Sequence, residues 1–103
     1  MVWRSDTNSV YVLCNDDTYE VYPGSVVPQG YFTDPLHKGA FGYYWTTDKN
    51  IRSRISDPTD IEFLATDFAV QDFANGTIFY FYQNETNNYV LFNATKSWLK
   101  RQE

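Results

Sequence analysis

The residue types that could support catalysis are few and scattered in this sequence. The single histidine, His37, lies in a proline-rich stretch, and no serine or cysteine occupies a recognisable nucleophile motif or zinc-ligand spacing. We therefore expect His37 to be solvated. Cys14 precedes Asn15, Asp16 and Asp17, and because negative charge raises a thiol pKa, we expect a packed, unreactive thiol. These residues predict that the protein is not an enzyme.

Paired carboxylates are the other catalytic arrangement to consider, because glycoside hydrolases use two of them. Neighbouring acidic residues in loops usually only solvate the surface, and no EF-hand spacing is present for Ca²⁺. A hydrolase and a Ca²⁺ site remain minor alternatives, and we expect no metal ion and no cofactor. The candidate pairs are Asp16 with Asp17, Asp57 with Asp60, and Glu62 with Asp67.

Aromatic side chains are the unusual feature of the composition. The chain has 9 Tyr, 8 Phe and 3 Trp, which together make 19% of its residues. So many rings exceed what a small core encloses, so some should reach the surface, where Tyr and Trp suit wet interfaces and sugar rings. An aromatic-rich β core is the alternative explanation, because aromatic residues also favour strands.

The length and net charge of the chain limit the fold classes and the kinds of partner that we expect. A chain of 103 residues and 12.1 kDa predicts a single small domain. Eight basic against thirteen acidic residues give a net charge of −5, which repels phosphate backbones, so we expect no nucleic-acid partner. No apolar run approaches the roughly 18 residues of a membrane helix, so we expect no membrane span. The first residues lack the apolar core of a signal peptide, so we expect any export signal to be absent or trimmed.

Alternating apolar residues and turn residues predict a mostly β chain built from short antiparallel hairpins. Residues 10–13 and 18–22 form one predicted hairpin, and residues 76–82 and 89–92 form a second, clearer one. Short strands are predicted at residues 61–64 and 68–70.

The remaining segments are predicted as loops, apart from the C-terminus. Residues 23–38 read as a surface loop, residues 41–47 as a short strand or tight turn, and residues 48–60 as another loop. Residues 95–101 lack alternation and end in basic residues, which predicts a short C-terminal helix capped by Asn93 or Thr95.

A weak internal repeat relates the two ends of the chain. Each copy has an aromatic strand, a polar turn with Thr and Asn, and a return strand that ends on Val. The copies are Trp3, Thr7-Asn8 and Val12, and Tyr80, Thr86-Asn87 and Val90. This pattern predicts two degenerate repeats, over residues 1–38 and 39–103.

Three blocks of the sequence resemble the LGFP repeat of cell-wall-associated proteins. They are Gly39-Ala40-Phe41-Gly42 with Thr46-Thr47-Asp48, the segment from Gln71 to Tyr80, and Thr86, Val90 and Trp98. The chain departs from the family where Tyr43-Tyr44-Trp45 replaces a proline, where residues 48–71 are longer, and where Asn87 replaces a glycine. The fungal fucose-lectin propeller blade is a second, poorer resemblance.

The resemblance implies a non-catalytic module, extracellular or at the cell surface, that binds cell-wall or surface polysaccharide. It implies a repeat or propeller-like arrangement. Because repeat stacks usually need at least three units, we expect a homo-oligomer or a longer repeat array.

A polysaccharide site would combine aromatic faces with groups that bond hydroxyls. Strand alternation places Thr77, Phe79 and Phe81 on one face, the natural core, and Ile78, Tyr80 and Tyr82 on the other. The expected site comprises the ring faces of Trp45, Tyr80, Tyr82 and Trp98 and the polar groups of Asp48, Gln71 and Asn87. The alternative is a protein-interaction domain, such as a viral or phage accessory factor, since Tyr and Trp also dominate protein interfaces.

Three glycosylation sequons begin at Asn75, Asn84 and Asn93. They would be used in a secreted eukaryotic or viral protein. We favour the interpretation that they are turn residues, because polar side chains and left-handed backbone are common in hairpin turns.

Overall fold

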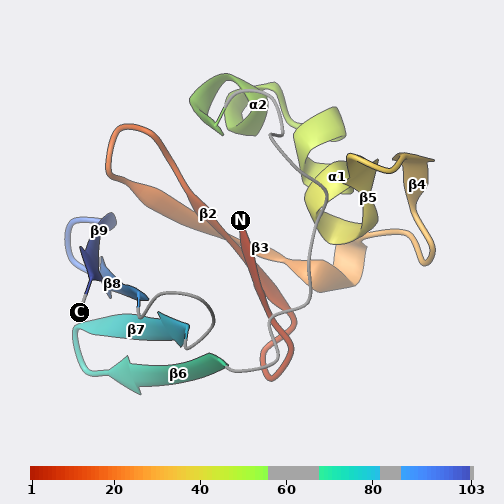
Figure 1. Cartoon of the computed structure of the whole chain (residues 1–103). Coiled ribbons are helices and arrows are strands. Elements are labelled where there is room, and N and C mark those ends of the chain that lie inside the picture. The colour runs from red at the N-terminus through yellow and green to blue at the C-terminus, as the bar shows by residue number, and fades with distance from the viewer. Residues whose placement is uncertain (56–67, 82–86, 103) are drawn as a thin grey trace. The chain divides into compact units, whose positions relative to one another are not determined.

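The computed structural model describes residues 1–55, 68–81 and 87–102, and the fold is mostly β, as predicted (Figure 1). The chain divides into two compact units. The first unit comprises Met1–Asp16 and Glu20–Glu62, and the second comprises Asp17–Tyr19 and Phe63–Glu103. This division differs from the proposed repeat boundary at residues 38 and 39, and the single domain with two repeats stays a prediction. Neither described helix has the length and apolar composition to span a bilayer.

The N-terminal part of the chain forms a three-stranded sheet in the order β1-β2-β3. Its strands are β1 (Val2–Arg4), β2 (Ser9–Leu13) and β3 (Tyr19–Pro23). Strands β1 and β2 are antiparallel with Trp3 opposite Val10, and the turn between them contains Asn8 in the left-handed conformation. The hairpin predicted from residues 10–13 and 18–22 is confirmed by β2 and β3.

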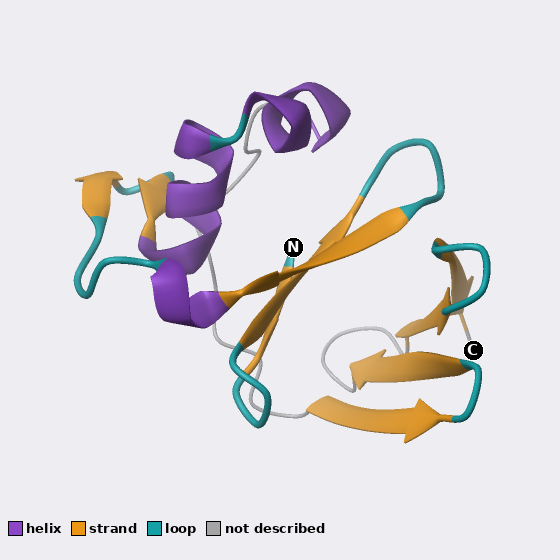
Figure 2. Ribbon diagram, turned by 180° about the vertical axis from the view of Figure 1, so that it is seen from behind, coloured by secondary structure: helices purple, strands orange, loops and turns teal. Residues whose placement is uncertain are grey.

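Helices occupy segments where the sequence predicted a strand or loops. After the 3₁₀ turn Gly24–Val26 and the two short antiparallel strands β4 (Phe32–Asp34) and β5 (His37–Lys38), the chain forms α1 (Gly39–Thr47) and α2 (Lys49–Ile55). The strand or turn predicted over residues 41–47 is wrong, and so is the loop over the described part of residues 48–60. Strand-favouring aromatic residues form α1 because packing overrides their local propensity. Figure 2 shows β4 and β5 beside α1.

The apolar core of the first unit joins its sheet to its helices. The buried core consists of Val10, Val12 and Cys14 from the β2 region, Tyr44 from α1 and Ile51 from α2. Its position follows the alternation of β2, in which every second residue is buried. The Asp48 carboxylate accepts hydrogen bonds from the backbone N–H groups of Asn50 (2.9 Å) and Ile51 (3.2 Å), which caps the start of α2.

The second unit is built on a four-stranded antiparallel sheet in the order β6-β7-β8-β9. Its strands are β6 (Phe68–Phe73), β7 (Gly76–Phe81), β8 (Asn87–Phe92) and β9 (Ser97–Gln102). The hairpin predicted around residues 76–92 is confirmed, and β6 confirms and extends the strand at 68–70, whereas residues 61–64 lie outside the described residues.

The predicted C-terminal helix is wrong, because Ser97–Gln102 is strand β9, paired with β8 along its length. The alternation was hidden because Trp98 and Leu99, two neighbouring apolar residues, lie on opposite faces of a sheet that has apolar side chains on both faces.

A short segment from the N-terminal half completes the second unit. Thr18 forms an antiparallel bridge with Ser97, the Tyr19 N–H donates to the Lys96 carbonyl (2.9 Å), and the Trp98 N–H donates to the Asp17 carbonyl (2.9 Å). The Tyr19 hydroxyl also donates to the Asn93 side-chain oxygen at 3.1 Å. Residues 17–19 therefore lie along β9.

Candidate functional site

The register of the four-stranded sheet assigns each described side chain to one of its two faces. Residues directly opposite each other in antiparallel strands share a face, and the register runs through β6–β9 without a shift. One face, here called the Phe73–Phe92 face, consists of three cross-strand rows. They are Phe73, Gly76, Phe92 and Ser97; then Gln71, Ile78, Val90 and Leu99; then Ala69, Tyr80, Asn88 and Arg101.

The Phe73–Phe92 face is apolar and open. Phe73 is 50% exposed, Phe92 41% and Leu99 39%, and no residue of the face is fully buried. Ile78 and Val90 lie half-buried at its centre. The polar residues Gln71, Ser97, Asn88 and Arg101 lie at its margins, and only Arg101 is charged. In a chain of net charge −5, the twelve described residues of this face include no carboxylate.

Gly76 lies on this face between the two exposed phenylalanines. It pairs with Phe73 on one side and with Phe92 on the other. A Cβ at this position would stand 2.2 Å from the Leu91 carbonyl oxygen, so only glycine fits the close approach of β7 and β8. The backbone between the two rings is therefore without a side chain.

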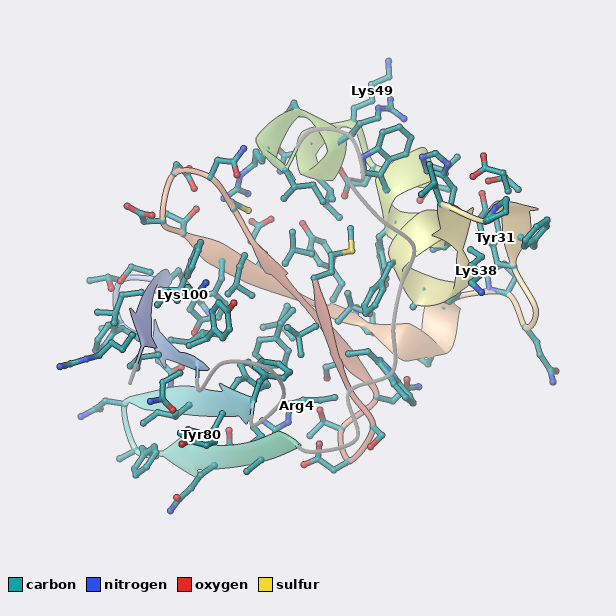
Figure 3. All side chains as sticks on the ribbon, in the orientation of Figure 1. Arg4, Tyr31, Lys38, Lys49, Tyr80 and Lys100 are labelled. Carbon is teal, nitrogen blue, oxygen red and sulfur yellow. The ribbon has the colours of Figure 1, made fainter. Side chains whose placement is uncertain are left out.

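The opposite face of the sheet, here called the Phe79 face, holds the buried residues. Thr77, Phe79 and Leu91 are 7%, 0% and 0% exposed, which confirms the prediction that the Thr77 and Phe79 side of β7 is the core side. Tyr89 contacts Phe81 edge-on (5.7 Å between ring centroids) and lies 6.3 Å from the Trp98 ring. Figure 3 labels Lys100 of β9, whose ammonium lies 5.9 Å from the Tyr89 ring centroid, and Tyr80 of β7.

The structure brings together only part of the site expected from the sequence. Gln71 and Tyr80 share the Phe73–Phe92 face, one row apart, whereas Trp98 lies on the Phe79 face. Tyr82 and the side chain of Asn87 lie outside the described residues.

Trp45 and Asp48 belong to the first unit, and both have local structural partners. The His37 ring lies 4.5 Å from the Trp45 ring, centroid to centroid, and the Arg52 guanidinium lies 5.5 Å from it. Asp48 caps α2. Trp45 and Asp48 therefore both contact neighbouring groups of the first unit.

The Asp34–His37 pair was missed by the sequence analysis. His37 Nδ1 lies 2.8 Å from Asp34 Oδ1, and the His37 side chain is only 19% exposed, so the expectation of a solvated histidine is wrong. The Asp34 carboxylate also accepts from the Leu36 N–H (2.9 Å), and the hydrogen bond with His37 is the main reason that the pKa of Asp34 is lowered. The Asp-Pro dipeptide at the β4–β5 turn is the signal that could have indicated this geometry.

The arrangement around His37 does not form a nucleophile site. Its Nε2 is buried, and among the described residues it has no hydrogen-bond partner, so no hydroxyl or thiol is held there as a nucleophile. The carboxylate holds the ring against Trp45. We interpret the Asp34–His37 pair as a structural link between the β4–β5 turn and α1.

The cysteine and the described carboxylates also have local explanations. Cys14 is buried, as expected, and burial is the main cause that raises the pKa of its thiol, with Arg54 opposing and Asp16 adding to it. Arg54 pairs with Glu20 (3.0 Å) and lies 3.7 Å from Asp16. Within the described ranges, no three His, Cys, Asp or Glu side chains gather as metal ligands. The pairs Asp57 with Asp60 and Glu62 with Asp67 lie outside these ranges.

Two of the three sequons lie in described turns. Asn75 is exposed in the two-residue connection between β6 and β7, and Asn93 follows β8, where its side-chain oxygen accepts from Tyr19. Neither has a left-handed backbone, which the structure assigns instead to Asn8, Asp17 and Lys96 among the described non-glycine residues. Asn84 lies outside the described residues, and use of the sequons stays a prediction.

Comparison with protein families, with curated proteins and with solved structures gives no match for this chain. The resemblance to the LGFP repeat therefore stays a hypothesis, and the candidate site depends on the geometry of the Phe73–Phe92 face.

Proposed function

We propose that the chain is a non-catalytic binding protein whose second unit docks on a protein partner through the Phe73–Phe92 face. The observation that carries this proposal is the make-up of the face as far as the structure describes it: apolar side chains lie at the centre, polar groups lie at the margins, and one of those groups is charged. Protein interfaces have this anatomy, with charged residues depleted at the core and aromatic residues enriched.

Charge defines the partner further. Its described residues include Arg101 and no carboxylate, although the chain as a whole is acidic. A partner with an apolar patch and a carboxylate opposite Arg101 would complement the Phe73–Phe92 face in both charge and hydrophobicity. Large aliphatic and aromatic side chains such as Phe73, Phe92 and Leu99 suit such a surface better than they suit the hydroxyl groups of a sugar.

Affinity capture from extracts of the source organism, followed by titration of the purified captured protein, tests the proposal. We expect Phe92→Ser to weaken binding at least about tenfold, as loss of a central aromatic contact does. The matched control is Phe32→Ser, which removes a 60% exposed phenylalanine from β4 in the first unit. A captured protein that binds wild type and Phe92→Ser equally would contradict the proposal.

Polysaccharide binding at the same face is the second candidate, and its setting would be extracellular or at the cell surface. It is supported by the exposed Gln71 amide one row from Tyr80, and by the resemblance of the β6–β7 segment to the LGFP repeat. A glycan array that includes arabinogalactan tests it. Sugar-competable binding that Tyr80→Ala abolishes and Trp98→Phe preserves would favour this candidate, and a blank array from folded protein would exclude it.

A further inference from the structure

The two margins of the four-stranded sheet are formed by β6 and β9. Among the described strands, β6 pairs only with β7. Its register is continuous from Phe68 opposite Phe81 to Phe73 opposite Gly76, with no bulge. Strand β6 is therefore a regular six-residue strand at the margin of the described sheet.

Edge strands in natural proteins carry devices that prevent pairing with another chain, such as lysines, prolines, bulges or a covering segment. Strand β9 has two of these devices. It contains Lys100 and Arg101, and residues 17–19 bond to its backbone near Ser97.

Within residues 1–55, 68–81 and 87–102, strand β6 shows none of these devices. Its sequence is Phe-Ala-Val-Gln-Asp-Phe, without lysine or proline. Its one charged residue, Asp72, accepts a hydrogen bond from the Thr77 hydroxyl at 2.8 Å, across to β7. This hydrogen bond ties the Asp72 carboxylate to β7.

We propose that β6 pairs antiparallel with β6 of a second copy of this chain, so that two four-stranded sheets join into one continuous sheet. The two-fold axis of such a pair is normal to the sheet. The Phe73–Phe92 faces of both copies then lie on the same side, which doubles the apolar surface. The proposal is independent of what that surface binds.

The alternation of side chains limits the register of the pair. Because opposite residues must share a face, even-numbered residues pair with even and odd with odd, so the axis passes through a residue pair and not between residues. Centring on Gln71 places Phe73 opposite Ala69 of the second copy and Asp72 opposite Val70. In this register the 50% exposed Phe73 ring covers a small apolar neighbour, and the two Asp72 carboxylates are not opposite each other.

A second copy is favoured over an unrelated strand by this self-complementarity. The register centred on Gln71 satisfies the face rule, pairs the apolar Phe73 with the apolar Ala69, and avoids a contact between the two Asp72 carboxylates, all with a single sequence. The amide side chains of the two Gln71 residues meet at the axis, where each has both a donor and an acceptor for the other.

Sedimentation equilibrium of the full chain over a wide range of concentration tests the proposal. We expect a reversible dimer in the wild type. Gln71→Lys places two ammonium groups opposite each other at the axis and should make the chain monomeric. Leu99→Lys adds the same charge on the same face, but on β9 at the opposite margin of the sheet, and should leave the dimer intact. A wild type that is monomeric throughout, or a dimer that Leu99→Lys but not Gln71→Lys disrupts, would overturn the proposal.

Cysteine cross-linking gives a second readout that does not depend on the lysine variant. Opposite residues of antiparallel strands have Cα atoms roughly 4.5–5.5 Å apart, within the range of a disulfide. Gln71→Cys should therefore form a disulfide-linked dimer under mild oxidation, and Leu99→Cys should not. The native Cys14 is buried and should not interfere. Equal cross-linking of the two variants, or none in either, would contradict the Gln71-centred pair.

Discussion

The two units of this chain use their apolar residues differently. The first unit gathers residues from β2, α1 and α2 into one enclosed core. The second unit is a single sheet with buried residues on its Phe79 face and exposed phenylalanines on the other. Helices give the first unit a second layer, whereas the described part of the second unit contains strands only.

This difference explains why the second unit exposes large apolar side chains on one face of its sheet. A β-sheet needs a covering layer on each apolar face to bury that face, and the four-stranded sheet has apolar side chains on both of its faces. The second unit therefore leaves Phe73 and Phe92 exposed on one face of its sheet, and it is there that we propose a partner binds.

The contrast between the faces predicts the largest stability effect. Phe79→Ala removes a ring that is 0% exposed and should cost about 3–5 kcal/mol of unfolding free energy. Phe92→Ala, on the open face of the neighbouring strand, should cost far less. Urea denaturation followed by circular dichroism measures both, and equal losses would show that the Phe73–Phe92 face is also covered.

The separateness of the units predicts a local effect in the first. Ile51→Ala should cost about 2–5 kcal/mol, because Ile51 is 1% exposed in the core of the first unit. Native-state hydrogen exchange should then show lowered protection in β2 and α2, with β7 and β8 unchanged. Equal loss of protection in both units would mean that they unfold as one cooperative body.

Close backbone contact in the first unit predicts an effect opposite to helix propensity. Gly42→Ala in the middle of α1 would gain up to about 1 kcal/mol from propensity alone. A Cβ there would meet the His37 carbonyl carbon at 2.2 Å, however, so we expect a net loss of about 1–3 kcal/mol. Thr46→Ala, at an exposed position of the same helix, is the control and should change the melting temperature little.

The smallest predicted effect depends on pH. Arg4 donates two hydrogen bonds to Asp6, at 3.0 and 2.7 Å, and these are the main cause that lowers the pKa of Asp6. The carboxylate therefore stabilises the fold above its unfolded pKa, and this contribution is lost as pH falls through the lower folded pKa.

The matching variant is Asp6→Asn. Its melting temperature should lie below that of wild type near neutral pH and converge with it below about pH 4. Thr7→Ala, which does not titrate, should show a difference that stays constant with pH. A gap between Asp6→Asn and wild type that persists in acid would contradict the role of the Arg4 bond.

The strands were predictable and the helices were not, for a physical reason. In β7, a period of two separated the buried Thr77 and Phe79 from the half-buried Ile78 and Tyr80, and pairing followed that period. In α1, Phe41, Tyr43 and Trp45 also alternate, and only contacts with distant segments, such as that of Tyr44 with the Pro23 carbonyl, select the helix. Local propensity does not contain such contacts.

The candidate site was predictable only where it depended on alternation. Alternation along residues 76–82 assigned Tyr80 to the face opposite Phe79, where the structure has it together with Gln71, whereas Trp98 lies on the Phe79 face, which could not be foreseen while residues 95–101 were taken for a helix. The exposed Phe73, Phe92 and Leu99 were missed, since each looks in isolation like a core residue. These side chains are exposed because no described segment forms a second layer over this face of the sheet, and their residue type alone does not indicate it.

The bond between Tyr19 and Asn93 joins groups 74 residues apart along the chain. During synthesis, residues 17–19 leave the ribosome long before β9 is made. Their hydrogen bonds to the β9 region therefore form only after the last strand has emerged. Closing so long a loop makes this a late event in folding. A fragment that begins after residue 62 would lack residues 17–19 altogether and leave β9 with a bare edge, and so would be prone to aggregate through that edge as well.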